Sequence, residues 1–290
     1  MSPTTAIRLV TWTNAWLTGH VALDDLVDGV RGDDVAHTFA FPDTLPQSPP
    51  ATGSSGVGAS GTGSMLHRPG GWPELSDADT DGRAGRQPRA AVAEALPIPL
   101  AMGELRRRGA TGLHLALPVA GDPLGIAGPP STTALVVDAG QAAVVGGAGI
   151  ALVPEVVGRG VQWTAVPASP PTAVASPAEA ERAMSEELLA AARELAALDV
   201  ARWNPGLPGL LADADPGRRA AELPSALGVR RTGLIARATR LRLALSLALA
   251  EDGGARTLAE SRRRRELLEP LERAVRRAVV AACAPDAAPA

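Results

Sequence analysis

The sequence predicts an α+β protein in which helices dominate, with an N-terminal helical hairpin, a small mixed sheet unit and a C-terminal helical bundle. Apolar residues make up 46% of the 290-residue chain but aromatic residues only 2%, so the core must consist of Ala, Leu and Val, which suit closely packed helices. Apolar residues recur at helical spacing on both sides of the chain's middle. Period-two alternation is confined to residues 97–167, which predicts a small sheet there.

Residues 1–41 are expected to form the hairpin. Apolar positions within residues 4–31 have the spacing of two short helices, and Gly19 separates them. The second helix carries three aspartates, which would repel phosphate. This acidity favours a packed hairpin over a DNA-reading helix-turn-helix.

Trp12 and Trp16 lie four residues apart, and so on one face of the first helix. Two interpretations are open. The rings anchor the hairpin on the rest of the protein, or they form an aromatic patch that binds a partner. Anchoring is the favoured interpretation.

Residues 42–96 are expected to form a disordered linker rich in Pro, Gly and Ser. Between residues 42 and 95, seven Pro and nine Gly make up 16 of 54 residues. With so few apolar side chains, the segment cannot offset the entropy lost on ordering. We expect it to tether the hairpin only loosely.

Residues 97–167 are expected to form the small α+β unit. Three leucines alternate with His114 and Ala116, which is typical of a strand with one apolar face. A loop rich in Gly and Pro, from Gly121 to Pro130, precedes a helix that begins at Ser131. The predicted elements are helices at 100–108 and 131–139 and strands at 113–117, 142–145, 150–153 and 161–166.

The helical bundle is expected to span residues 177–283. Ser176 and Glu179 have the spacing of a capping box, with Pro177 at the first helical position, so a helix begins here. Its predicted apolar stripe consists of Met184, Leu188, Ala191, Leu195 and Leu198. Further helices are predicted at 216–223, 230–250 and 257–282, the last containing Pro270; a Pro-rich spacer at 168–176 and a disordered tail at 284–290 flank the bundle.

Three stretches within residues 97–290 are distinctive: GDPLGIAGPP from Gly121, ALVPEVVGRGVQW from Ala151 and RRRRELLEPLERAVRRAVVAA from Arg262. In these stretches the chain resembles uncharacterised conserved proteins of high-GC Gram-positive bacteria. The resemblance implies a fold and a source. It implies no catalytic residue, because no activity accompanies it.

Residue-level chemistry is sparse in this sequence. The single cysteine, Cys283, excludes an intramolecular disulfide and a Cys-based zinc site. The four histidines are scattered, without the close pairing of a transition-metal site. We therefore assign no catalytic residue, no cofactor and no metal ligand, and expect that the protein is not an enzyme. The loop from Gly121 to Pro130 is a less favoured place for an enzymatic or ligand-binding site.

The charge distribution raises one further hypothesis. A net charge of −3 and a pI near 5.9 do not mark the chain as a nucleic-acid binder. Between residues 230 and 282, however, thirteen Arg oppose six acidic residues. Arg262, Arg263 and Arg264 are thus candidate nucleic-acid-binding residues, whereas pairing with the acidic helix after Pro177 is the favoured alternative.

The sequence also predicts a cytoplasmic protein without a membrane partner. The first twenty residues lack the basic and apolar regions of a secretory signal, and the most apolar stretch, 132–154, contains Asp138 and Gln141. These observations favour a non-enzymatic interaction or scaffold protein that binds a protein partner through helical surfaces. The alternative is a nucleic-acid-binding protein that uses its Arg-rich C-terminal helices.

Overall fold

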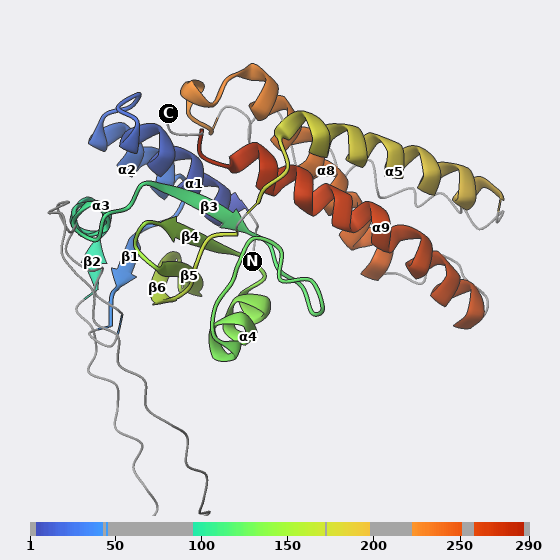
Figure 1. The fold of residues 1–290 in the computed structure, drawn as a ribbon, viewed down its shortest axis with the longest axis horizontal. Helices are drawn as coiled ribbons and strands as arrows, with labels where there is room; N and C mark the ends of the chain where they lie inside the picture. Colours follow the sequence, from blue (N-terminus) through green and yellow to red (C-terminus); the bar gives the residue numbers. More distant parts are fainter. Residues whose placement is uncertain are drawn as a thin grey trace, which may run out of the picture. The chain divides into compact units, whose positions relative to one another are not determined.

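The computed structural model describes residues 4–42, 45, 95–171, 173–197, 222–250 and 258–286 (Figure 1). Three sequence predictions fall mostly or partly outside these ranges. They concern the linker at 42–96, the helix at 216–223 and the end of the tail at 284–290.

The described residues form seven α-helices and one mixed sheet of six strands, which confirms the helix-rich α+β class. The helices are α1 Thr4–Leu17, α2 Leu23–Arg31, α3 Ile98–Arg107, α4 Pro130–Ala139, α5 Pro177–Ala197, α8 Val229–Ala250 and α9 Leu258–Cys283. The strands are β1 His37–Ala40, β2 Leu96–Pro97, β3 Gly112–Ala116, β4 Ala142–Gly146, β5 Ile150–Val157 and β6 Gly160–Pro167. A short 3-10 turn, η1 Ser225–Leu227, precedes α8.

The strand order in the sheet is β2-β1-β6-β5-β4-β3. Strands β3 to β6 form an antiparallel meander, and each overlaps one of the strands predicted at 113–117, 142–145, 150–153 and 161–166. Strand β1 pairs parallel to β6, with Phe39 beside Trp163, and β2 pairs antiparallel to β1. Strand β1 was not predicted from the sequence, because four residues are too few to show a period.

Helices cover the two faces of the sheet unequally. On one face, Leu113, Leu115 and Trp163 join side chains of α1 and α3 in the main core. On the other face, Val136 of α4 packs in a smaller cluster with Val144 and neighbouring apolar side chains. In Figure 1, α4 accordingly lies on one side of the sheet, whereas α1 and α3 lie on the other.

The N-terminal hairpin is part of the main core, so the expectation of a loose tether is wrong. Ile7, Leu9 and Val10 of α1 are each at most 1% exposed. Helix α1 buries this much because its apolar residues spread around most of its circumference and meet both the sheet and the neighbouring helices.

The free edge of strand β3, at one end of the sheet, is closed by a side chain of α1. Asn14 accepts a hydrogen bond from the Leu113 N–H through Oδ1 (2.7 Å) and donates one to the Leu113 carbonyl through Nδ2 (2.9 Å). The amide therefore takes the place of a neighbouring strand, and no further strand can add at this point.

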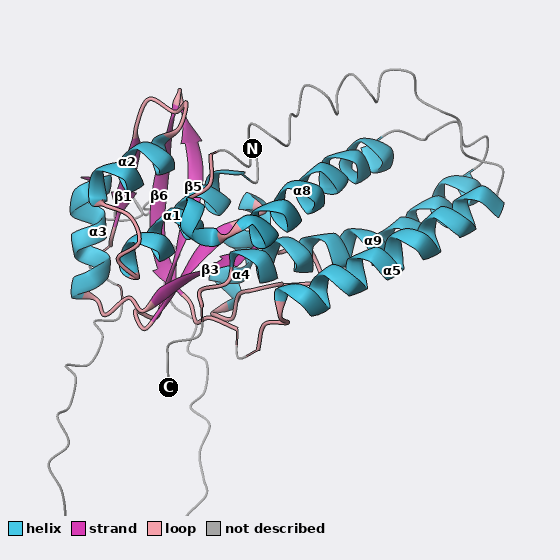
Figure 2. Ribbon diagram, turned by 90° about the horizontal axis from the view of Figure 1, so that it is seen from above, coloured by secondary structure: helices cyan, strands magenta, loops and turns pink. Residues whose placement is uncertain are grey.

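In the C-terminal part, α9 lies between α5 and α8 and packs along both (Figure 2). The predicted capping box of α5 is confirmed: Ser176 Oγ accepts from the Glu179 N–H (3.3 Å), and Glu179 Oε2 accepts from the Ser176 N–H (3.0 Å). Pro270 lies inside α9 without ending it.

The predicted stripe of α5 needs one correction. Met184 and Ala191 are buried, at 5% and 6% exposure, but Leu188 is 42% exposed. Residue 188 lies about 40° around the helix from residue 184, and so at the margin of the buried face. Leu198 lies outside the described residues.

Among the helices that the structure describes, none is both long and apolar enough to span a bilayer.

Candidate interaction site

The loop that begins after β3 is held on α9 by one buried arginine. The Arg276 side chain is 2% exposed and donates to the Leu117 carbonyl (2.9 Å), to Asp122 Oδ2 (2.9 Å) and to the Glu272 carboxylate (2.8 Å). All three of its nitrogens thus have partners, as a buried charge requires. The network fixes the first part of the loop from Gly121 to Pro130 against the middle of α9.

Gly125 brings the same loop tightly against the sheet. Its φ of +88° lies in the left-handed region, and a Cβ built there would come within 2.7 Å of the Leu115 carbonyl oxygen. Only glycine fits this position without strain. The loop is therefore anchored at two points, on α9 and on β3.

A pocket of about 320 Å³ opens between this anchored loop, the segment before α5 and the C-terminal half of α9. Its wall is apolar except for one guanidinium. The lining residues are Leu124, Gly125, Pro171, Ala173, Val174, Ala175, Arg277 and Val280. Such a composition favours binding of an apolar group over catalysis, because a catalytic site needs several convergent polar side chains.

A second hollow of about 330 Å³ lies beside this pocket, along the seam between α5 and α9. The two hollows share Ala175 and Arg277 in their linings, and we refer to the pair of neighbouring hollows as the α5–α9 groove. The second hollow is lined by Ala175, Glu179, Ala180, Ala183, Glu187, Pro270, Arg273, Ala274 and Arg277. Small alanines on both helices create the space.

The charges along the α5–α9 groove are separated. Arg273 and Arg277 lie on α9, four residues apart and on one face. Arg277 has no ion pair or hydrogen bond within the described part of the chain, and Arg273 only reaches Asp122 at 4.0 Å. Glu179 is engaged in the capping box, whereas Glu187, farther out on α5, has no partner among the described residues.

The candidate nucleic-acid residues lie on the opposite half of α9. Arg262 and Arg263 are exposed, Arg264 is half-buried, and Arg263 faces Glu266 at 3.7 Å. They ring the helix instead of forming one stripe, because consecutive residues point about 100° apart. None of the three lines the α5–α9 groove.

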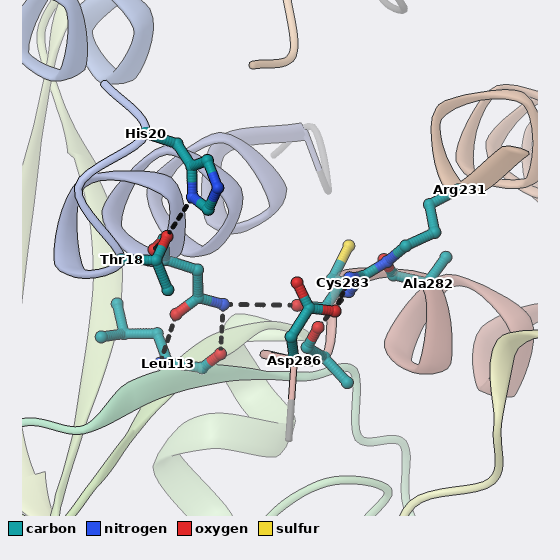
Figure 3. A network of polar contacts seen from close by, with 9 residues as sticks. Thr18, His20, Leu113, Arg231, Ala282, Cys283 and Asp286 are labelled. Carbon is teal, nitrogen blue, oxygen red and sulfur yellow. Dashed lines mark hydrogen bonds and ion pairs between the residues drawn. The ribbon is translucent and has the colours of Figure 1, made fainter. Parts of the chain in front are cut away.

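Two arginines of α8 have partners within the protein, and one of them pairs with the acidic helix, as the alternative hypothesis expects. Arg237 forms an ion pair with Glu181 of α5. Arg231 donates to the Ala282 carbonyl (2.8 Å), to Asp286 Oδ1 (2.8 Å) and to the Ala284 carbonyl (Figure 3). Internal pairing therefore neutralises part of the local excess of positive charge.

Trp12 and Trp16 are both packed within the fold. Trp12 lies directly over Gly29 of α2, and its Nε1–H donates to the Glu222 carbonyl (2.8 Å). Trp16 is 8% exposed, and the Arg106 guanidinium lies 3.7 Å from the centre of its ring. These contacts support the anchoring interpretation. Partner binding by this pair stays a prediction.

Cys283 lines a polar cavity of about 60 Å³ at the C-terminal end of α9. Figure 3 shows the surrounding network, in which Thr18 bonds His20 at 2.8 Å and Asn14 reaches the Cys283 carbonyl at 3.5 Å. Burial raises the pKa of the Cys283 thiol to about 12, so it stays protonated at neutral pH and is a poor nucleophile.

His37 has a fixed structural role. The Trp163 Nε1–H donates to its Nδ1 (3.1 Å), so the proton on Nε2 is directed to Asp34 (2.9 Å), which also accepts from Arg8. Burial lowers the pKa of His37 although Asp34 opposes this effect. Both ring nitrogens are engaged, which leaves no position for general base catalysis.

His114 is half-buried on the sheet face that α4 covers, and its Nδ1 has no hydrogen-bond partner within the described part of the chain. Burial lowers its pKa, so the ring is neutral at neutral pH. Elsewhere in the described ranges, no three His, Cys, Asp or Glu residues gather closely enough to hold a metal ion.

The Gly121–Pro130 loop was a candidate site from the sequence, but its partners on α5 and α9 were not predicted. The loop is held by a contact between residues 159 positions apart, Leu117 and Arg276, which no local pattern reveals. The available signals were the glycines of the loop and the many alanines of the two predicted helices.

Models of two known protein domains match this chain along most of its length. The model of the N-terminal domain of Rv1486c-like proteins matches residues 6–179, and the model of the C-terminal domain matches residues 178–280. The two matches meet where α5 begins. Neither the curated proteins nor the solved structures contain a match. Rv1486c is a mycobacterial protein, which agrees with the resemblance to proteins of high-GC Gram-positive bacteria. The chain therefore belongs to the family of Rv1486c-like proteins.

Proposed function

We propose that this protein is a non-enzymatic interaction protein of the cytoplasm that binds a protein partner in the α5–α9 groove. The observation that carries the proposal is the groove itself, two neighbouring hollows of which the one beside Gly125 has an apolar wall and the one between α5 and α9 combines alanines with charged side chains. Clefts of this kind accept segments of partner chains, because apolar side chains in them are removed from water.

The rigidity of the groove supports the proposal. Arg276 holds the loop on α9, and the capping box fixes the start of α5 at the inner end of the groove. A surface fixed before binding loses less conformational entropy when its partner arrives. The same anchoring argues against the loop as a catalytic site, since its only acidic side chain, Asp122, is already bonded to Arg276.

A pair of matched variants tests the proposal. Ala183 lines the groove, whereas Ala190 lies outside it; both are exposed on α5. We expect Ala183→Trp to fill the groove and Ala190→Trp to leave it open. In quantitative affinity capture from the native host, at least one protein should be retained by the wild type and by Ala190→Trp but lost with Ala183→Trp.

The same captures test the alternatives. If wild type and Ala183→Trp retain the same proteins, the proposal is wrong. If the retained material is nucleic acid, and Arg262→Gln, Arg263→Gln and Arg264→Gln together remove it, the nucleic-acid hypothesis replaces the groove.

A further inference from the structure

We propose that the α5–α9 groove recognises an acidic peptide segment, in which a carboxylate lies next to apolar side chains. The carboxylate would bind Arg277 and Arg273, and the apolar side chains would enter the pocket beside Gly125. This inference rests on the proposed function and specifies its partner by chemistry.

The inner end of the groove sets the apolar requirement. Seven of the eight residues that line the pocket are apolar or glycine, and its volume of about 320 Å³ is that of a small ligand site. No described side chain in this wall offers a hydrogen bond except Arg277. A polar group placed here would find no side-chain partner other than Arg277, so the pocket favours an apolar occupant.

The guanidinium groups set the charge requirement. Arg277 belongs to both hollows and has no partner in the described residues. Asp122 is already bonded to Arg276 at 2.9 Å, so its 4.0 Å approach to Arg273 leaves most donors of that guanidinium unused. A guanidinium presents five N–H donors in a fork that matches a carboxylate. Two such forks, four residues apart on α9, favour an anionic group at this place.

The length of the groove favours a peptide over a small amphiphile. The α5 wall extends from Glu179 to Glu187, about 12 Å along the helix axis. The groove is open along this side, and its outer end carries the unpartnered Glu187 carboxylate. A ligand that fills it must therefore place its negative charge against Arg273 and Arg277 on α9, and neutral or basic groups against Glu179 and Glu187 on α5. An extended chain or a helix of a partner protein can meet both conditions.

Selection from a phage-displayed library of random 12-residue peptides on the full chain tests the proposal. Groove-dependent clones are those that bind the wild type and Ala190→Trp but not Ala183→Trp. We expect these clones to be enriched in Asp or Glu beside Leu, Ile, Val or Phe. Synthetic peptides from them should lose about fivefold or more in affinity for Arg277→Gln, and also when their own Glu is changed to Gln.

Arg240→Gln is the control, because it removes an exposed arginine of α8 outside the groove and should leave the affinity unchanged. Panning on Arg277→Glu should shift the selected clones toward basic residues, provided that the variant melts at the wild-type temperature.

Each other outcome contradicts either the acidic peptide as ligand or the groove as an interaction site. Groove-dependent clones that are neutral or basic, or that ignore Arg277→Gln, overturn the acidic peptide but leave the groove as an interaction site. The absence of any groove-dependent clone overturns both proposals. If dodecanoate alone binds with the same dependence on Arg277, the ligand is a small amphiphile and the peptide proposal is wrong.

Discussion

The two sides of α9, one facing the sheet and one facing the groove, treat neighbouring arginines in opposite ways. Arg276 and Arg277 are neighbours in α9, yet Arg276 is buried with all its nitrogens bonded, whereas Arg277 is exposed and unpartnered among the described residues. On the sheet side, His37 likewise has a partner for each ring nitrogen. Along the groove, Arg277 and Glu187 have none within the same ranges.

This difference teaches that arginine content is a weak guide to function in this chain. A rotation of about 100° around α9 converts a structural residue into a candidate recognition residue. The two regions should therefore respond to substitution very differently, the sheet side in stability and the outer surface in binding.

The largest effect is expected for substitution of Arg276, the buried arginine of the pair. Arg276→Ala leaves Asp122 and Glu272 without their partner, so we expect a loss of about 3–5 kcal/mol in the free energy of unfolding. Arg277→Ala should change it by less than about 0.5 kcal/mol, as at an ordinary surface position. Urea denaturation of both variants measures the difference, and equal losses would contradict it.

A similar contrast is expected on α5. Met184→Asp buries an unpaired carboxylate between α5 and α9, and we expect it to cost about 3 kcal/mol. Leu188→Asp should cost clearly less, because this side chain is 42% exposed and the carboxylate can reach water. Melting temperatures give the order. If Leu188→Asp is the more damaging, the buried face of α5 has been placed wrongly.

Acidification should weaken the sheet side. Because burial lowers the pKa of His37 from its ordinary 6.5, the unfolded chain takes up a proton first as the pH falls. The contribution of neutral His37 to the free energy of unfolding is complete above pH 6.5. It decreases below pH 6.5, by at most about 1.4 kcal/mol per pH unit. Urea curves at pH 7.5, 6.5 and 5.5 should show this slope.

His114 contributes in the same direction, because burial lowers its pKa too. His37→Gln and His114→Gln should therefore each remove part of the slope. A wild-type free energy of unfolding that stays constant from pH 6.5 to 5.5 would contradict the prediction.

The smallest effect is expected on the outer half of α9. Replacing Arg262, Arg263 and Arg264 together by Gln should change the free energy of unfolding by only about 0.2–1 kcal/mol for each exposed pair lost. We expect wild type and variant to show equal background retention on duplex DNA at low salt. Retention by the wild type alone, with a salt slope that falls by about 0.9 per lost phosphate contact, would instead support nucleic-acid binding.

Local patterns in the sequence predicted most of the fold. Leucine alternation located β3, the short apolar runs at 142–145 and 150–153 located β4 and β5, and Ser176 with Glu179 marked the start of α5. Each of these signals acts over a few residues. The parallel pairing of β1 with β6 was not predictable, because it joins segments more than 120 residues apart and β1 has only four residues.

The candidate site was less predictable for the same reason. The sequence indicated the loop from Gly121 to Pro130, but not that Asp122 would be bonded to Arg276. It also drew attention to the dense run Arg262 to Arg264, whereas the arginines that line the groove, Arg273 and Arg277, were indistinguishable from their neighbours. Which arginine is buried depends on the rotation of α9 against the sheet, a tertiary property.

The bond between Arg276 and the Leu117 carbonyl has a consequence for synthesis of the protein. The two residues are 159 positions apart, so at about 5–20 residues per second the ribosome needs roughly 8–32 seconds to make the second after the first. During this interval the strands can pair, but Asp122 lacks its partner and the loop has nothing to hold it on α9. The nascent chain therefore carries a sheet without a finished groove, and the groove is complete only after translation has passed α9.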